Sequence, residues 1–328
     1  MTRSASLRAD APAPPAPRWW QSQRLRRALL PAFALVVLAL LASHARDVDW
    51  AGAWRALRGY DARTLALAAL LAAGSHALYG CFDLLGRGYT RHGLRAGAVW
   101  TTAFVSYAFN LNLGALVGGF GLRLRLYSRL GLRPGVIGRV IGLSLVTNWL
   151  GHAAAGGTVL LAGAITLPPG WPLHGTALRL FGAALLAGVA GYLALCVFSR
   201  RRAWTLRGHR IELPPTPIAL MQLTLSTLNW SLMGATLFVL LGERVPYPSV
   251  LGVLLLAGIA GVVTHIPAGL GVLEAVFVTL LAGRLPQGTL LGAVLAYRAL
   301  YYLLPLAVAV AAYFAIEGLA GRQKRLRK

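Results

Sequence analysis

Long apolar segments recur along the whole chain, and short segments rich in arginine separate them. A helix needs about 20 mainly apolar residues to cross the hydrocarbon core of a bilayer. Inside that core every backbone N–H and C=O group must be paired within the protein, which favours helices. Hydrophobic residues make up 57% of the 328 residues, and charged residues only 12%. The pattern therefore predicts an all-α polytopic membrane protein.

The placement of the arginines predicts the topology. Short cytoplasmic loops of membrane proteins carry an excess of Lys and Arg. Of the 32 Lys and Arg residues, the topology that we favour places 24 in the cytoplasm, seven outside and only Arg298 inside the membrane. Both termini are then cytoplasmic. This topology has about six full transmembrane helices, at residues 28–43, 63–85, 140–163, 176–198, 217–241 and 289–317.

We expect one transmembrane domain at residues 28–318, between a disordered basic cytoplasmic tail (1–27) and a second basic tail (319–328). Residues 46–60 are interpreted as an amphipathic helix on the outer interface. The formal net charge of +23 does not predict a nucleic-acid partner, because the arginines lie in separate loops. Cys81 and Cys196 lie in apolar runs, so we expect neither a disulfide nor a metal site, and no cofactor is predicted.

Two apolar segments cannot be single crossings in this topology. Residues 96–120 lead into a loop with five arginines, which one crossing would place outside. Polar and glycine residues interrupt this segment, so we expect a re-entrant hairpin of two half-helices, each about ten residues long. Residues 250–283 start and end outside and are broken at 265–271 by a proline and two glycines, so we expect a hairpin or a pair of helices that enters from outside. Two oppositely directed hairpins suggest an inverted repeat with a midplane site, although the halves show no convincing sequence identity.

One arginine and one glutamate lie in the apolar C-terminal segments. Arg298 falls near mid-membrane, where an arginine costs at least about 2.5–3.5 kcal/mol, so a partner is expected. Glu274, just after the second break, is the predicted partner. Tyr301 and Tyr302 follow at helical spacing, and Pro305 frees the backbone carbonyl of Tyr301 at the same level. The pair predicts either a contact for an anion or lipid headgroup, or a structural ion pair that only locks two helices.

Further polar residues accompany the first hairpin. Asp83 lies in the second span and is a candidate site residue, unless it reaches the loop arginines. Arg123 and Arg125 follow the hairpin, and either one enters the cavity or both are topology charges at the inner surface. Asn110 and Asn112 either contact substrate or satisfy broken backbone. The other polar side chains in the spans are interpreted as core histidines or interhelical hydrogen-bonding groups, namely His76, His152, His265, Asn148, Gln222 and Asn229.

Two stretches carry a resemblance to a known family. Residues 267–274 read Pro-Ala-Gly-Leu-Gly-Val-Leu-Glu, and residues 297–305 read Tyr-Arg-Ala-Leu-Tyr-Tyr-Leu-Leu-Pro. Both resemble motifs of the YbhN-like family, which shares the flippase-type membrane domain of lysylphosphatidylglycerol synthases (MprF). Residues 112–125 resemble that family's first broken segment, and residues 48–50 resemble its outer amphipathic helix. Ala268 departs from the family, which usually has glycine there, and this leaves the turn less flexible.

The resemblance implies a membrane domain with paired re-entrant helices that moves or exposes a phospholipid. By position, Glu274 and Arg298 match the family's charged cavity residues, and Arg123 and Asp83 are weaker matches to such residues. The predicted substrate-binding residues are Glu274, Arg298, Arg123, Asp83, Tyr301 and Asn112, and the motif backbone is formed by Pro267, Gly269, Gly271 and Pro305.

We therefore expect a lipid translocase or lipid-binding protein of the bacterial inner (plasma) membrane. It would handle a phospholipid or lipid-linked headgroup, and its expected partners in the membrane are phospholipids with anionic or phosphate-bearing headgroups. It is not expected to be an enzyme. The synthases make their lipid with an additional aminoacyltransferase domain, and we expect no such domain in the eleven residues that follow Glu317 here. Two alternatives stay open: a membrane partner that organises a lipid- or glycan-modifying enzyme without transport, and a secondary transporter of a soluble anion. The sequence also leaves the oligomeric state open.

Overall fold

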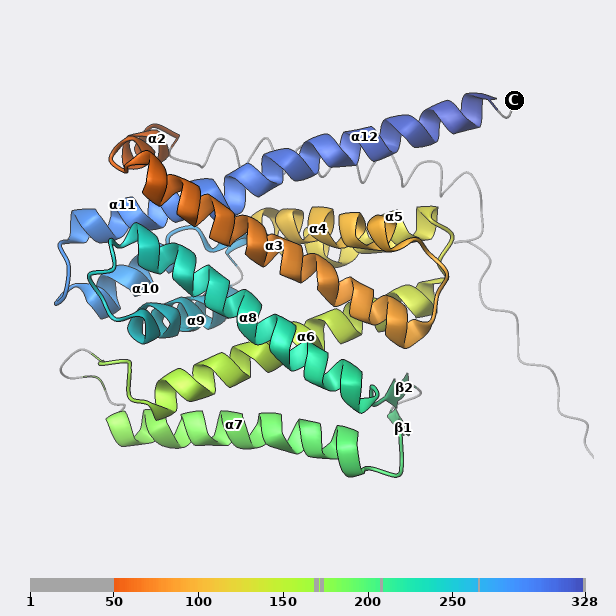
Figure 1. Ribbon diagram of the computed structural model, residues 1–328, viewed down its shortest axis with the longest axis horizontal. Helices are drawn as coiled ribbons and strands as arrows, with labels where there is room; N and C mark the ends of the chain where they lie inside the picture. Colours follow the sequence, from red (N-terminus) through yellow and green to blue (C-terminus); the bar gives the residue numbers. More distant parts are fainter. Residues whose placement is uncertain (1–49, 168–170, 172–173, 207–208, 265, 327–328) are drawn as a thin grey trace, which may run out of the picture. The chain divides into compact units, whose positions relative to one another are not determined.

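The computed structural model describes residues 50–167, 171, 174–206, 209–264 and 266–326 (Figure 1). The first expected span (28–43) and the N-terminal tail lie outside these residues. Among the described residues, five helical stretches are long and apolar enough to cross a membrane, which confirms the all-α polytopic class. They are α3 (Ala62–Thr90), α7 (Gly175–Phe198), α8 (Thr216–Leu240), α9 (Tyr247–Thr264) and the continuous stretch Gln287–Ala315.

Two elements between these stretches refine the expected fold. Helix α6 (Pro134–Leu161) has 28 residues, but polar side chains such as Asn148 and His152 make it less apolar than the five. A short antiparallel hairpin of β1 (Ala203–Leu206) and β2 (His209–Glu212) connects α7 to α8. The strands lie between the expected spans 176–198 and 217–241, and they leave the helical class unchanged.

The described part of the amphipathic segment is the helix α2 (Trp50–Arg58). It packs against α11 (Gln287–Tyr297), beside the start of α3. The side chain of Asp61 caps α3 by accepting a hydrogen bond of 2.6 Å from the backbone N–H of Thr64. This hydrogen bond stabilises the carboxylate and lowers the pKa of Asp61 below its ordinary value.

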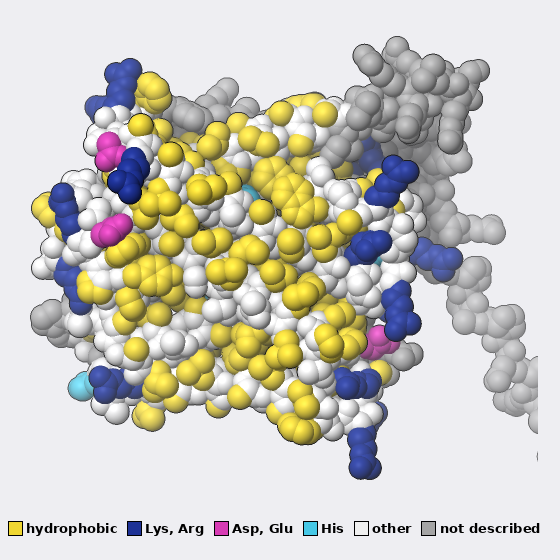
Figure 2. All heavy atoms as spheres, in the orientation of Figure 1, with side chains coloured by type: hydrophobic (Ala, Val, Ile, Leu, Met, Phe, Trp, Pro, Cys, Tyr) yellow, Lys and Arg dark blue, Asp and Glu magenta, His cyan; other side chains and the backbone are white. Residues whose placement is uncertain are grey.

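Lys and Arg side chains gather at the two ends of the face shown in Figure 2, and the band between them is mainly hydrophobic. The end of α3 and the starts of α4 (Ala96–Leu113) and α6 meet at one of these ends. We call it the arginine-rich end, because more of the arginines lie there. It carries Arg87, Arg91, Arg95, Arg129, Arg133, Arg139, Arg200, Arg201 and Arg202. The opposite, arginine-poor end carries Arg55, Arg58, Arg63, Arg179, Arg244 and Arg284.

The first hairpin opens at the arginine-rich end, but its arms are longer than expected. Helix α4 has 18 residues, or about 27 Å at 1.5 Å per residue, so the expected half-helix of about ten residues is wrong. The chain turns at Gly114, whose φ of +83° suits glycine alone. A π-helical segment, Ala115–Leu122, and the helix α5 (Arg123–Arg129) then return along α4.

The second hairpin opens at the arginine-poor end, and its arms α9 and α10 (Val272–Leu281) pack against each other. Helix α9 has 18 residues and α10 has ten. A loop with a short 3₁₀ turn at Pro267–Gly269 joins them. The two hairpins therefore open at opposite ends of the bundle. Because α9 is itself long enough to cross a membrane, the re-entrant arrangement stays a prediction.

Candidate functional site

Three breaks in the helices, far apart in the sequence, meet in one region. The last span contains a π-helical turn, Arg298–Leu303, between α11 and α12 (Leu304–Leu326). This turn contacts α4, and the loop of the second hairpin contacts α4 as well. Asn112, at the tip of the first hairpin, donates from Nδ2 to the backbone carbonyl of Tyr302 over 3.2 Å. The tips of both hairpins thus lie against α4 and the π-helical turn.

Arg298 joins the π-helical turn to the second hairpin. Its Nε and Nη2 donate to the two carboxylate oxygens of Glu274, with a distance of 3.0 Å from Nη2 to Oε2. Its Nη1 and Nη2 also donate to the carbonyls of Ala268 and Gly269 over 2.9 and 2.7 Å. The guanidinium lies 5.5 Å from the ring centroid of Tyr302. The predicted pairing of Glu274 with Arg298 is confirmed, and the two loop carbonyls are additional partners.

The loop that supplies these carbonyls has an unusual backbone. Gly269 and Gly271 have φ values of +55° and +78°, which explains why the motif needs glycine at both positions. Ala268 also lies in the left-handed region, with φ +55°. An alanine in this conformation costs about 1–2 kcal/mol, because its Cβ approaches a backbone oxygen. The contact of Arg298 with the Ala268 carbonyl helps to hold this strained turn.

We expect Ala268→Gly to raise the free energy of unfolding by about 0.5–1 kcal/mol. The substitution removes the strain at Ala268, and the greater freedom of glycine in the unfolded chain offsets part of the gain. Unfolding by denaturant in one detergent would measure the change. Ala275→Gly, in the regular helix α10, is the matched control and should lower stability instead. A loss of stability in Ala268→Gly as large as in the control would contradict the assignment of strain.

A second ion pair lies deeper in the bundle. Asp83 on α3 is fully buried, and its Oδ1 lies 3.2 Å from Nη2 of Arg123 on α5. The same nitrogen donates to Oγ of Ser144 over 3.3 Å. The hydroxyl of Tyr127 donates to Asp83 Oδ2 over 2.8 Å. Asp83 therefore pairs with the first of the five arginines expected in the loop after residues 96–120. Arg123 is an interior charge rather than an inner-surface one, so the expectation that Arg298 alone lies inside is wrong.

Tyrosine and serine side chains fill the space between the two ion pairs. Arg123 lies 5.6 Å from the ring centroid of Tyr79, which stacks on Tyr107 at 3.5 Å. The hydroxyl of Tyr107 lies 3.0 Å from that of Tyr301, which in turn lies 2.6 Å from Oγ of Ser75. These four residues, Tyr79, Tyr107, Tyr301 and Ser75, are called the tyrosine cluster below. It lies between Arg123 and the π-helical turn that carries Arg298.

Tyr301 and Tyr302 were expected to share the face of Arg298, but they have different neighbours in the structure. Tyr302, not Tyr301, contacts Arg298, because i→i+5 bonding in the π-helical turn widens the spacing around the helix. Tyr301 is fully buried in the tyrosine cluster. Asn112 bonds to the carbonyls of Ala108 and Tyr302, which supports its role in satisfying broken backbone. The carbonyl that accepts at this level is that of Tyr302, whereas Pro305 was expected to free that of Tyr301.

The polar residues assigned to helix packing mostly have that role. Gln222 on α8 bonds to Thr147 on α6 and to Tyr192 on α7. Asn229 accepts from Ser75 over 2.8 Å. His76 bonds through Nδ1 to the carbonyl of Ala72. The ring nitrogens of His152 have no hydrogen-bond partner among the described residues, so this histidine is buried but not satisfied, and His265 lies outside those residues.

Arg298 and Arg123 contact different groups of side chains. Their ion-pair and hydrogen-bond partners belong to separate sets, and the tyrosine cluster connects the two. Two hollows on the described surface lie at the arginine-poor end, near Thr166. Neither is lined by Glu274, Arg298 or Arg123. The expected midplane cavity, with both arginines facing it, therefore stays a prediction.

The family model described as "Lysylphosphatidylglycerol synthase TM region" matches residues 28–309. The chain belongs to this synthase transmembrane-region family. "Inner membrane protein YbhN" of Escherichia coli (strain K12) is 45% identical over 312 residues, which cover 95% of this chain and 96% of that protein. "Uncharacterized protein slr0712" of Synechocystis sp. is 28% identical over 314 residues, or 94% and 97% of the two chains. This member of the synthase transmembrane-region family is therefore a YbhN-like, multi-pass inner-membrane protein.

Several partners of the charged residues in this family member were not predicted from the sequence. Tyr127, Ser144 and Tyr79 surround the Asp83–Arg123 pair, and none of them was singled out. Tyrosines and serines are common in helices, so their type alone carries little signal. Their depth in apolar spans was the available clue, because buried hydroxyl groups need partners.

Proposed function

We propose that this protein is a translocase for phospholipids with anionic or phosphate-bearing headgroups. The observation that carries the proposal is Arg298, a cation in an apolar span whose partners are a carboxylate and two carbonyls of a hairpin loop. A phosphate group accepts the same forked hydrogen bonds from a guanidinium as a carboxylate does. A headgroup phosphate can therefore take the place of Glu274 as the partner of Arg298.

Exchange of this partner would move the hairpin tip. Arg298 holds the loop at Ala268 and Gly269, so a change in the position of its guanidinium releases both carbonyls. The loop then shifts against α4 and opens a path beside the π-helical turn. Irregular backbone of this kind is typical of transporters, in which broken helices form the substrate site. The acyl chains remain in lipid while the headgroup crosses, and no chemical step is part of the proposal.

The second ion pair supplies the next contact on the same path. The hydroxyl groups of the tyrosine cluster lie between Arg298 and Arg123, so a headgroup leaving one arginine meets polar groups before the other. Asp83 neutralises Arg123 when no headgroup is present. In this proposal the arginine-rich end and both termini face the cytoplasm, in agreement with the usual excess of positive charge on that side.

Translocation of a fluorescent phosphatidylglycerol in proteoliposomes tests the mechanism. We expect Arg298→Gln to lower the rate at least about tenfold, because hydrogen bonds to charged groups contribute about 1.5–3 kcal/mol. Arg244→Gln, an exposed arginine at the arginine-poor end, is the matched control and should keep the wild-type rate. The reconstituted amount and the thermal unfolding of each variant are measured in parallel.

The double variant Glu274→Gln/Arg298→Gln separates a headgroup contact from a helix lock. If the pair only locks two helices, two neutral amides should restore the loop and keep the wild-type rate. If Arg298 binds the headgroup, the double variant stays as slow as Arg298→Gln. A wild-type protein without translocation activity would contradict the proposal and favour a membrane partner of a lipid- or glycan-modifying enzyme.

A further inference from the structure

A hollow of about 510 Å³ opens at the arginine-poor end, between the end of α6 and the start of α7. Its volume lies within the range of small-molecule sites, about 300–1,000 Å³. The lining combines apolar walls with hydroxyl groups and one cation. The lining residues used below are Leu160, Gly163, Thr166, Thr176, Leu178 and Arg179.

Arg179 is the cation of this hollow. Its guanidinium crosses Gly163, and a Cβ built on that glycine would lie 2.9 Å from Nη2. Gly163 has a φ of +68°, so both its conformation and its lack of a side chain leave room for the arginine. Within the described ranges no carboxylate pairs with Arg179. The guanidinium is therefore available to an anionic ligand.

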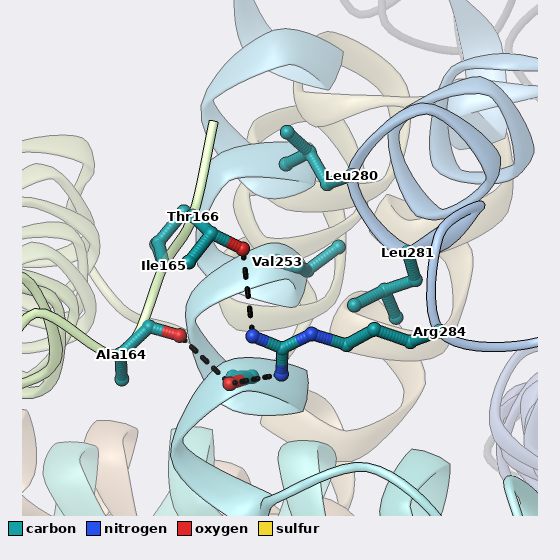
Figure 3. A pocket seen from close by; sticks show the side chains of 8 residues that line it. Ala164, Ile165, Thr166, Val253, Leu280, Leu281 and Arg284 are labelled. Atoms are coloured by element: carbon teal, nitrogen blue, oxygen red, sulfur yellow. Dashed lines mark hydrogen bonds between the residues drawn. The ribbon is translucent and has the colours of Figure 1, made fainter. Parts of the chain in front are cut away.

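A second arginine, Arg284, lies in the smaller neighbouring hollow drawn in Figure 3, where its guanidinium points toward Thr166. Arg284 donates from Nη2 to Oγ1 of Thr166 over 3.4 Å, and from Nη1 to Oγ of Ser249 over 3.1 Å. Ser249 in turn donates to the carbonyl of Ala164 over 2.7 Å. These bonds fix the segment that carries Thr166. Since Thr166 accepts from Arg284, its own hydroxyl proton is free for a ligand in the hollow.

We propose that this hollow is a binding site for a phosphate-bearing anion. Arg179 forms the charged contact, and the hydroxyl groups of Thr166 and Thr176 donate hydrogen bonds. Helix α7 begins at Gly175, so the unpaired N–H groups of its first turn add positive potential on the same wall. Arg284 acts through Thr166 and adds a second positive charge nearby.

Two sources can supply this chemistry, namely a phospholipid headgroup and a free phosphate. The apolar walls at Leu160 and Leu178 suit the glycerol and first methylene groups of a lipid, whereas a free phosphate needs only the polar side. The proposal does not depend on translocation, because the hollow shares no lining residue with the Arg298–Glu274 pair. It describes an equilibrium binding site at one surface of the membrane protein.

Binding to the purified full-length protein in a neutral detergent tests the proposal. The probes are soluble dihexanoyl phosphatidylglycerol and sodium phosphate, titrated at constant ionic strength and followed by calorimetry. We expect Arg179→Gln to weaken binding of at least one probe about tenfold or more, and Thr166→Val to weaken it less. Arg244→Gln, an exposed arginine at the same end that does not line the hollow, should bind as the wild type does.

The two probes identify the source. Binding of the lipid alone assigns the hollow to a headgroup, and equal binding of both assigns it to phosphate itself. Arg298→Gln should keep this affinity, which separates the site from the proposed translocation path. The proposal would be overturned if neither probe binds, if Arg179→Gln binds as tightly as the wild type, or if Arg244→Gln loses as much affinity as Arg179→Gln. Because Arg179 is exposed, Arg179→Gln should fold, and a matching unfolding temperature would verify this.

Discussion

Replacing Asp83 with asparagine is expected to lower the free energy of unfolding by about 3–5 kcal/mol. The substitution leaves the charge of Arg123 in the interior without a counter-charge. Asp83 is 0% exposed and Arg123 is 4% exposed, so water cannot replace the lost partner without opening the bundle. Denaturant unfolding in one detergent, at fixed pH and salt, would measure the difference from the wild type.

A double-mutant cycle identifies the cause of that loss. Arg123→Gln alone should also be strongly destabilised, because the carboxylate of Asp83 then stays buried without its cation. The double variant Asp83→Asn/Arg123→Gln removes both charges and should recover much of the loss. Glu243→Gln, an exposed carboxylate at the arginine-poor end, is the control. If Asp83→Asn is as stable as this control, the buried pair does not stabilise the fold.

Gly118→Ala is expected to have the second largest effect, a loss of about 1–3 kcal/mol. A Cβ at this position would meet the backbone of Phe109 and Asn110 on α4, and backbone cannot rotate away as a side chain can. The arms of the first hairpin would have to separate. The same unfolding experiment measures the loss.

The matched control for this substitution is Gly138→Ala. Gly138 lies in helix α6, and a Cβ built there meets no atom within 4 Å. Alanine favours a helix more than glycine does, so this variant should be at least as stable as the wild type. Equal stability of the two alanine variants would show that the arms of the first hairpin can accommodate a methyl group at position 118.

Charge placement predicted more of the fold than apolar periodicity did. The loop arginines required two hairpins that open at opposite ends, and the structure contains both. The lengths of their arms were not predictable in the same way, because the π-helical geometry of Ala115–Leu122 has no distinct residue pattern. Apolar residues indicated that α4 is buried, and only the backbone shows that it continues for 18 residues to Leu113.

The candidate site was predictable where a residue type was rare. Glu274 and Arg298 were paired from sequence, since each is an isolated charge in an apolar segment and each needs a partner. Asp83 and Arg123 were both identified, and Asp83 was expected to pair with one of the two arginines, Arg298 or Arg123, but which of them was left open. Sequence gives the depth of each charge along its helix, whereas the packing of α3 against α4 and of α5 against α6 decides which charges face each other.

The π-helical turn Arg298–Leu303 makes the last span sensitive to chain length. Such a turn is equivalent to an α-helix with one inserted residue. Deletion of Leu300 would restore a continuous α-helix and leave α11 and α12 facing nearly as they do now, because the turn already absorbs the extra residue. Every motif residue would still be present, but Arg298 and Tyr302 would be three positions apart rather than four, which moves the Tyr302 ring around the helix relative to the guanidinium. The spacing between Arg298 and Tyr302 is therefore as much a part of the motif as the residues themselves.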